Sequence, residues 1–222
     1  MNPAPIRVLI VDDDPLVRSA LRLMLAGSDE IVLVGEAEDG SQVPSAVRQY
    51  TPDVVLMDIR MPRVDGLAAT EHLAGLPSPP QIIILTTFDA DDHVLRAVRA
   101  GASGFLLKDT RAADLIQAVK LVADGEAILS PAITRKLLAH VSEPAGPARG
   151  RQDRAATLLT RLTPREHEVA RAVGQGKSNA EISAELFLGI PTVKTHVSRL
   201  MAKLDLNNRV QIAMLMHDAD ER

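Results

Sequence analysis

The chain has 222 residues, 46% of them hydrophobic and 24% charged, which is typical of folded globular proteins. It has no cysteine, no tryptophan, one tyrosine and three phenylalanines, which excludes disulfides and thiolate metal sites and disfavours aromatic platforms for single-stranded nucleic acid. The net charge of −4 is unevenly distributed: residues 1–128 carry 11 basic and 19 acidic side chains, and residues 129–222 carry 14 and 10. Nucleic acid therefore fits only the second part as a partner.

No stretch approaches the roughly 20 consecutive apolar residues that a membrane-spanning helix needs. The first residues, MNPAPIRVLIVDDD, contain only a short apolar run before three acids and do not have the pattern of a signal peptide. We therefore expect no membrane segment and a cytoplasmic location, which the lack of cysteine also suits.

Five short apolar runs rich in β-branched residues alternate with five segments of helical periodicity over the first 124 residues. The predicted strands cover residues 6–11, 31–37, 54–57, 82–85 and 104–107. The predicted helices cover residues 15–26, 41–50, 65–75, 90–100 and 111–124, and Asp14 followed by Pro15 is a typical helix start. This alternation predicts an α/β doubly wound, parallel, five-stranded sheet with helices on both faces.

Strand signals are absent from the rest of the chain. A helix is predicted over residues 131–141, followed by EPAGPARGRQDRAAT, which is rich in proline, glycine and charge and predicts a flexible linker. Four short helices follow, over residues 164–173, 179–187, 190–204 and 209–216. We therefore predict a first domain over residues 1–128, a linker helix and flexible linker over 129–157, and a small all-α domain over 158–222.

Polar side chains follow four of the predicted strands. Asp12 and Asp13 come after the first strand, Asp58 after the third, Thr86 after the fourth and Lys108 after the fifth. The carboxyl ends of parallel strands meet at one edge of the sheet, where ligands bind. Three carboxylates placed together repel one another unless a cation joins them, and oxygen ligands favour Mg²⁺.

Each of these residues, taken singly, has an ordinary structural explanation, since aspartate commonly caps helices or turns and lysine is commonly solvated. Their agreement in position across four strands favours a magnesium site with phosphoryl chemistry at a carboxylate. In such a site Lys108 would neutralise an incoming phosphoryl group and Thr86 would donate a hydrogen bond to it.

The motifs VDDD, LMDIRMPRVDG, LTTFD and AGASGFLLKD, in this order, resemble the signatures of the response-regulator receiver domain over residues 6–124. The resemblance implies that Asp58 is the phosphorylation site. It also implies that Asp12, Asp13 and the main-chain carbonyl of Ile59 join Asp58 in holding Mg²⁺.

The same resemblance implies roles for three further residues. Thr86 would be the switch hydroxyl, Lys108 the lysine that pairs with the phosphoryl group, and Phe105 the switch aromatic residue. A phenylalanine in a buried strand is also an ordinary core residue, so both interpretations stay open for Phe105.

The predicted helix over residues 190–204 is amphipathic. Val193, Val197, Leu200 and Leu204 recur at helical spacing and predict a core face. The other face has basic groups suited to phosphates and short polar groups suited to base edges. It carries Lys194, Thr195, His196, Ser198, Arg199 and Lys203. From this pattern alone, a solvated amphipathic helix is the favoured interpretation.

Residues 162–216, with GKSNAEIS followed by TVKTHVSRLMAKL, are similar to the LuxR-family helix-turn-helix of NarL-type regulators. The resemblance implies that the helix over residues 190–204 enters the major groove of double-stranded DNA. The implied base or groove contacts are Lys194, Thr195, Ser198 and Arg199. The implied backbone contacts are Lys177 and His196, with Lys203 also among the DNA-binding residues.

Two features lie at the starts of these helices. Asn179 is expected to cap the helix over residues 179–187. Gly189, Ile190 and Pro191 stand where the LuxR family commonly has serine and two polar or small residues. Proline and glycine are tolerated at a helix start, but an exposed Ile190 would alter the groove contacts there.

Together these observations predict a phosphorylation-activated transcriptional regulator of a two-component system, not an enzyme. It would accept a phosphoryl group on Asp58 from a sensor histidine kinase and bind promoter DNA as a homodimer. Three alternatives are weaker. Asp-nucleophile phosphatases carry a second aspartate where this chain has Arg60, and a dinucleotide-binding oxidoreductase would need the GxGxxG motif that is missing after the first strand. A dimerisation module that is never phosphorylated would not need the complete set of polar residues.

Overall fold

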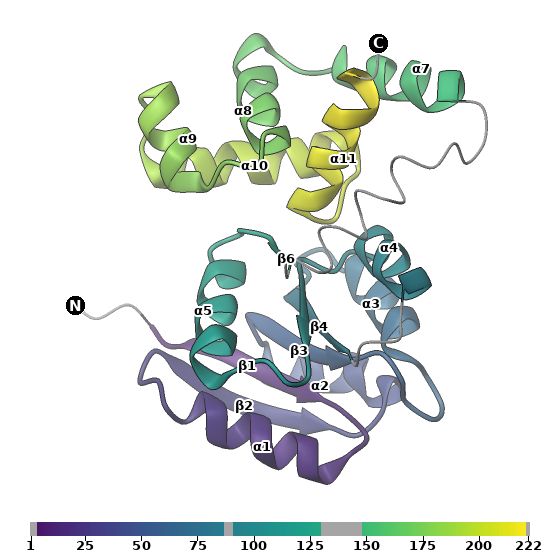
Figure 1. Cartoon of the computed structure of the whole chain (residues 1–222), viewed down its shortest axis with the longest axis vertical. Helices are drawn as coiled ribbons and strands as arrows, with labels where there is room; N and C mark the ends of the chain where they lie inside the picture. The colour runs from purple at the N-terminus through teal and green to yellow at the C-terminus, as the bar shows by residue number, and fades with distance from the viewer. Residues whose placement is uncertain (1–3, 87–90, 130–147, 221–222) are drawn as a thin grey trace. The chain divides into compact units, whose positions relative to one another are not determined.

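The computed structural model describes residues 4–86, 91–129 and 148–220 (Figure 1). The chain divides into two compact units, Met1–Arg135 and Lys136–Arg222. The helix predicted over residues 131–141 lies outside the described residues. Among the described helices, none combines the length and the apolar character that crossing a membrane requires.

The first unit is built on a parallel sheet with strand order β2-β1-β3-β4-β5-β6 (Figure 1). Its strands are β1 (Ile6–Val11), β2 (Ile31–Ala37), β3 (Val54–Asp58), β4 (Gln81–Thr86), β5 (Gly104–Leu107) and β6 (Ile128–Leu129). The five predicted strands are confirmed. The two-residue β6, which pairs with β5, is too short to give a sequence pattern.

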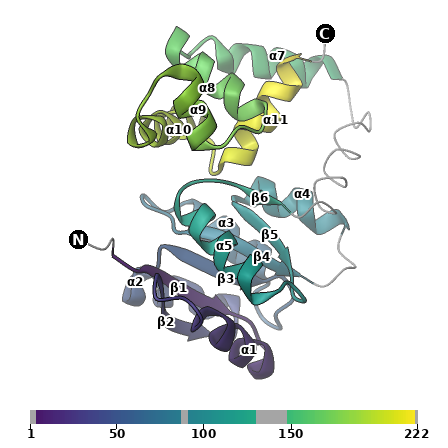
Figure 2. The same ribbon diagram turned by 60° about the vertical axis from the view of Figure 1, so that its left-hand side comes forward.

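Helices cover both faces of this sheet, as predicted. They are α1 (Pro15–Leu25), α2 (Val43–Tyr50), α3 (Gly66–Ala74), α4 (Asp91–Ala100) and α5 (Ala112–Ala123), with a short 3₁₀ turn, η1 (Gly40–Gln42), before α2. Helices α1 and α5 pack together on one face, and α2, α3 and α4 lie on the other (Figures 1 and 2). The strands are therefore enclosed on both sides, and Ile10, Leu56 and Ile83 are fully buried among them.

Local caps place two helices directly after the strands that end at the same edge. The Asp14 carboxylate accepts a hydrogen bond from the Leu16 amide at 2.8 Å, which confirms the predicted start of α1. The Asp65 carboxylate accepts one from the Ala68 amide at 2.7 Å at the start of α3. The connections after β1 and β3 are thereby fixed on either side of the point where the strand order reverses.

The second unit is entirely helical in its described part. Its helices are α7 (Ala148–Leu159), α8 (Pro164–Gly174), α9 (Asn179–Leu186), α10 (Ile190–Leu204) and α11 (Arg209–Asp220). The four helices predicted after residue 158 are confirmed. The flexible linker predicted over the preceding residues is wrong for 148–157, because they belong to α7.

Helix α7 is stabilised because its few apolar side chains pack against the core of the second unit. Ala155 is buried, and Leu158 and Leu159 pack against the core formed by α8, α9, α10 and α11. These three residues form an apolar stripe at helical spacing within a segment that is otherwise charged and glycine-containing.

Candidate functional site

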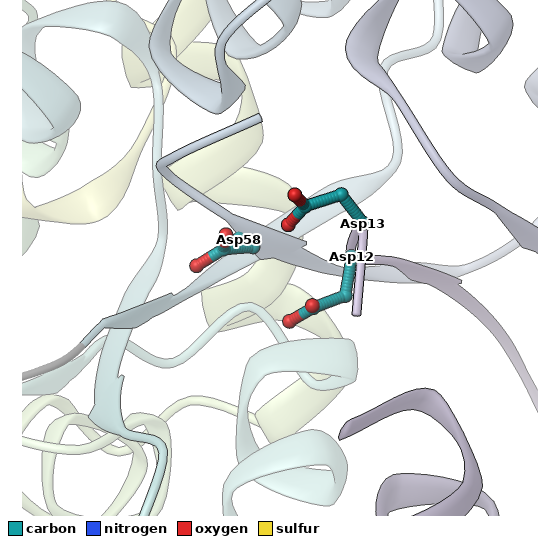
Figure 3. A group of neighbouring side chains, drawn as sticks. All are labelled: Asp12, Asp13 and Asp58. Atoms are coloured by element: carbon teal, nitrogen blue, oxygen red, sulfur yellow. The ribbon is translucent and has the colours of Figure 1, made fainter. Parts of the chain in front are cut away.

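Three carboxylates meet at the carboxyl edge of the sheet, as the sequence predicted (Figure 3). Val11 of β1 lies opposite Met57 of β3, so Asp12 and Asp58 follow on adjacent strands. One carboxylate oxygen from each of Asp12, Asp13 and Asp58 lies within 4.8 Å of the others. Asp12 and Asp58 are buried, whereas Asp13 is exposed.

Lys108, at the end of β5, joins the two buried carboxylates. Its Nζ lies 2.8 Å from Asp12 Oδ2 and 2.9 Å from Asp58 Oδ1. Its backbone amide donates a hydrogen bond of 2.9 Å to the carbonyl of Thr86, a buried residue that ends β4. The sheet therefore brings together all five polar residues predicted from the strand ends.

Burial and ion pairing shift the pKa values of Asp58 and Lys108. Desolvation raises the pKa of the Asp58 carboxyl, the hydrogen bond and charge of Lys108 oppose this only in part, and the nearby charge of Asp12 adds to the rise. Burial alone would lower the pKa of Lys108, but its hydrogen bonds to Asp12 and Asp58 outweigh burial and raise it. The Lys108 ammonium thus pairs with two of the three clustered carboxyl groups, and the remaining negative charge fits a divalent cation with oxygen ligands.

The loop after β3 is held by an aspartate that the sequence analysis did not identify. Asp39 is buried and accepts hydrogen bonds from the amides of Ser41 at 2.9 Å and Arg63 at 3.0 Å. Hydrogen bonds, led by the one with the Ser41 side chain, hold the pKa of this carboxyl well below its ordinary range. Asp39 therefore stays ionised and ties the loop after β2 to the loop that follows Asp58.

Arg18 is a second supporting residue without a clear sequence signal. It is a buried arginine on α1 whose Nη1 donates a hydrogen bond of 2.8 Å to the main-chain carbonyl of Asp12. Its guanidinium also pairs with Glu36 at 3.3 Å and Glu38 at 2.9 Å. Arg18 thus fixes the backbone at the end of β1.

The main chain after Asp58 forms a tight loop in which Gly66 returns to contact the backbone of Asp58 and Ile59. The Gly66 amide donates a hydrogen bond of 2.9 Å to the carbonyl of Ile59, so this predicted metal ligand already has a partner within the chain. A Cβ atom at Gly66 would lie 2.0 Å from the carbonyl oxygen of Asp58, so only glycine fits there without a shift.

An open hollow of about 460 Å³ lies beside Asp13 and this loop. It is lined by Asp13, Ile59, Arg60, Met61, Pro62 and Asp65. Phe105, by contrast, is fully buried in β5 opposite Ile84 of β4. It is a core residue in this structure, and its switch role stays a prediction.

In the second unit, α10 has the two predicted faces. Val193, Val197, Leu200 and Leu204 are buried. On the other side, Thr195, Ser198 and Arg199 are exposed, and Lys194 and His196 are half-buried. The candidate nucleic-acid contacts therefore lie along one helix, supported by an aliphatic core.

Two of the predicted DNA-binding lysines form ion pairs within this unit. Lys177 pairs with Glu185, and Lys203 Nζ lies 2.7 Å from Glu166 Oε2. Glu166 also completes a capping box with Thr163 at the start of α8.

The N-cap of α9, predicted at Asn179, lies one residue earlier in the chain. Ser178 is the N-cap and forms a capping box with Glu181, whereas Asn179 is buried. The Asn179 side-chain oxygen accepts a hydrogen bond of 2.7 Å from Arg209 Nη1, and Arg209 also donates to the carbonyl of Lys177. Asn179 therefore ties the start of α9 to the start of α11.

Glu166→Gln is expected to destabilise the second unit by up to about 1 kcal/mol at pH 7, because glutamine can keep the capping box but loses the ion pair with Lys203. The hydrogen bond from Lys203 is the main cause that lowers the pKa of Glu166 from 4.5 to about 2. The stabilisation is therefore present above pH 4.5 and lost as the pH falls toward 2. Urea unfolding across this range measures it.

Glu168→Gln is the matched control, because Glu168 pairs with Arg165 at 2.7 Å on a more exposed part of the same helix. We expect a smaller loss from it. A Glu166→Gln effect that did not change between pH 7 and pH 2 would contradict the assigned ion pair.

Comparison with protein families assigns both units. Residues 8–120 match the family described as response regulator receiver domain. Residues 160–216 match the family described as bacterial regulatory proteins, luxR family.

Related proteins match this chain over nearly their whole length. The uncharacterized transcriptional regulatory protein YxjL of Bacillus subtilis (strain 168) is 39% identical over 212 residues, covering 95% of this chain and 94% of that protein. The nitrate/nitrite response regulator protein NarL of Escherichia coli (strain K12) is 32% identical over 218 residues, covering 97% of each. The crystal structure of ChrA, a response regulator in a heme-sensing two-component system, has 36% identity and a TM-score of 0.54, covering 97% of this chain and 98% of ChrA. This chain therefore belongs to the response regulators in which a receiver domain is followed by a LuxR-family DNA-binding domain.

Proposed function

We propose that this chain is a phosphorylation-activated transcriptional regulator of a two-component system. It accepts a phosphoryl group on Asp58 from a sensor histidine kinase and binds double-stranded promoter DNA as a homodimer in the cytoplasm. The observation that carries this proposal is the buried Asp58 carboxylate, held 2.9 Å from the Lys108 ammonium and within 4.8 Å of the Asp12 and Asp13 carboxylates.

The phosphotransfer forms one bond and breaks one. An Asp58 carboxylate oxygen attacks the phosphorus atom of a phosphohistidine, the new O–P bond forms an acyl phosphate, and the P–N bond breaks. The leaving imidazole takes a proton from solvent. Lys108 lies close enough to Asp58 to stabilise the negative charge of the transferred group.

Mg²⁺ fits the donor set at this position. Two buried and one exposed carboxyl groups offer hard oxygen ligands, and within the described residues the Lys108 ammonium pairs with only two of the three. We propose that Asp12, Asp13 and Asp58 hold the ion, which would supply charge neutralisation between the carboxylate and the phosphoryl oxygens. The Ile59 carbonyl, the fourth predicted ligand, accepts one hydrogen bond from Gly66 and has a second lone pair that the ion could use.

Phosphorylation would change the balance of charge around Lys108. The modified Asp58 carries about 1.5 to 2 negative charges, which draw Lys108 away from Asp12 and favour a hydrogen bond from Thr86. Thr86 ends β4 and Lys108 follows the adjacent strand β5, on which Phe105 is buried opposite Ile84. A shift of these residues would bias an equilibrium between two packings, one of which dimerises.

Helix α10 is the proposed recognition helix. Its exposed Thr195, Ser198 and Arg199 and its half-buried Lys194 and His196 supply groups for base edges and phosphates. To bind phosphates, Lys177 would have to break its ion pair with Glu185, and Lys203 its ion pair with Glu166. We therefore expect these two lysines to contribute less to affinity than Arg199.

The test combines intact mass with DNA binding on the full chain. With Mg²⁺ and acetyl phosphate, the wild type should gain the mass of one phosphoryl group and bind more tightly to duplexes enriched from a random library. Asp58→Asn should show neither change. Asp53→Asn is the matched control, because Asp53 is an exposed acid beside the first residue of β3 and should leave both results intact.

Failure of the wild type to gain a phosphoryl group from both acetyl phosphate and a phosphorylated histidine kinase would contradict the proposal. DNA binding that is equal in wild type and Asp58→Asn would favour the constitutive dimerisation module instead. Turnover of a phosphate monoester by the chain would favour the phosphatase alternative, which the named transcriptional regulators among the relatives disfavour.

A further inference from the structure

The first turn of α10 is apolar where a recognition helix meets the bases. Gly189 is its N-cap and supplies no side-chain cap, and Ile190 and Pro191 follow without any polar side-chain group. Ile190 is 44% exposed, one of few large apolar side chains with this exposure among the described residues. The described part of the second unit therefore leaves nearly half of the Ile190 side chain uncovered.

Thr195 extends this apolar surface by one turn. Its hydroxyl donates a hydrogen bond of 2.9 Å to the carbonyl of Pro191, four residues earlier on the same helix face. Because the hydroxyl hydrogen is used within the helix, Thr195 has no donor left for a base. Its side chain is exposed, so it can offer its methyl group to a ligand.

We infer that Ile190, Pro191 and Thr195 read the 5-methyl groups of thymine in the major groove, an inference that rests on the proposed DNA-binding function. The N-terminal residues of a recognition helix contact base edges, and among the bases only thymine presents a methyl group there. Exposed Arg199 lies on the same helix, and residues 129–222 carry four more basic than acidic side chains, so the apolar turn belongs to a surface suited to duplex DNA.

The first two residues of α10 lack side-chain groups that could donate a hydrogen bond to a base. Guanine and adenine are read in the major groove by side chains that donate hydrogen bonds. Ile190 and Pro191 have no such donor, and that of Thr195 is bound to Pro191. The apolar groups at the start of α10 therefore suit a thymine methyl, and recognition of guanine or adenine by hydrogen-bond donors falls to other residues of the helix.

The test removes only the methyl groups from the DNA. The full chain, treated with Mg²⁺ and acetyl phosphate, is used to enrich duplexes from a random library that contains thymine. The enriched sequence is then resynthesised with uracil in place of thymine, one position at a time, because uracil pairs with adenine but lacks the 5-methyl group. We expect one or two positions in each half-site to lose about fourfold in affinity per methyl group.

Protein variants assign the effect to this turn. Ile190→Ser should bind thymine and uracil duplexes with nearly equal affinity at one of these positions, whereas Ile190→Val keeps a branched apolar side chain and should retain the difference. Thr195→Ser keeps the hydroxyl but not the methyl group, and should reduce the difference at a neighbouring position.

Equal affinity of the wild type for thymine and uracil duplexes would overturn the inference while leaving DNA binding intact. A thymine preference that Ile190→Ser and Thr195→Ser do not change would also overturn it, because the methyl groups would then act through DNA shape or another residue. Enrichment of no duplex at all would refute the proposed function itself.

Discussion

Lys108→Met is expected to lower the free energy of unfolding of the receiver domain by roughly 3–5 kcal/mol at pH 7 without divalent cations, because it leaves buried carboxylates without their cation. The lysine side chain is 21% exposed and lies within 3 Å of both Asp12 and Asp58, which are almost fully buried. Urea unfolding in the presence of a chelator measures the loss. The variant should also fail to gain a phosphoryl group.

The pH dependence identifies the cause. Burial raises the pKa of Asp58, so the ionised carboxyl destabilises the fold at neutral pH, and this cost disappears as the pH falls below the folded-state pKa. Without Lys108, the rise in the pKa of Asp58 would be larger. The difference in stability between wild type and Lys108→Met should therefore shrink on acidification.

Lys120→Met is the matched control on the same domain. Lys120 pairs with Glu30 at 2.6 Å, but these side chains are 30% and 65% exposed, and such a pair contributes about 1 kcal/mol or less. An equal loss from both lysine variants would show that Lys108 does not hold the buried carboxylates together.

Gly66→Ala is expected to destabilise the receiver domain by about 3 kcal/mol, because the added methyl group cannot fit without moving backbone. Its Cβ would lie 2.0 Å from the carbonyl oxygen of Asp58 and 2.9 Å from the carbonyl carbon. The start of α3 would have to move away from the end of β3. We therefore also expect slower phosphorylation by acetyl phosphate, measured by intact mass over time.

Gly75→Ala tests the same substitution at the other end of α3. There the nearest atom to an added Cβ is the His72 carbonyl oxygen at 3.6 Å, which is ordinary contact, and Gly75 has a right-handed backbone with φ of −78°. We expect a change within about 1 kcal/mol and normal phosphorylation. Similar effects of the two substitutions would show that the close approach to Asp58 does not constrain the site.

Local patterns in the sequence determined most of the secondary structure and one edge of the sheet. The apolar β-branched runs give strands buried on both faces, and Asp14 before Pro15, or Thr163 before Pro164, starts a helix through contacts a few residues apart. The position of Asp12, Asp13, Asp58, Thr86 and Lys108 follows from the strand pattern alone, because parallel strands end at a common edge.

The residues that hold the sites in place depend on partners far away in the chain. Asp39 binds the amide of Arg63, 24 residues later, and Lys203 pairs with Glu166, 37 residues earlier. Arg209 binds Asn179, so the asparagine supports the fold of the second unit while Ser178 caps the helix. None of these pairings has a local spacing, and each forms only because helices and loops pack in one particular arrangement.

The short strand β6 and the helix α7 also depend on tertiary structure. β6 has two residues and exists through its pairing with β5, and α7 is held by Ala155, Leu158 and Leu159 against the helical core. Local propensity favours neither element strongly, since the segment of α7 is rich in charge and contains a glycine. The sequence by itself thus determined the strands, most helices and the chemistry at the strand ends, whereas long-range packing decided which charged groups are paired and which remain exposed to a ligand.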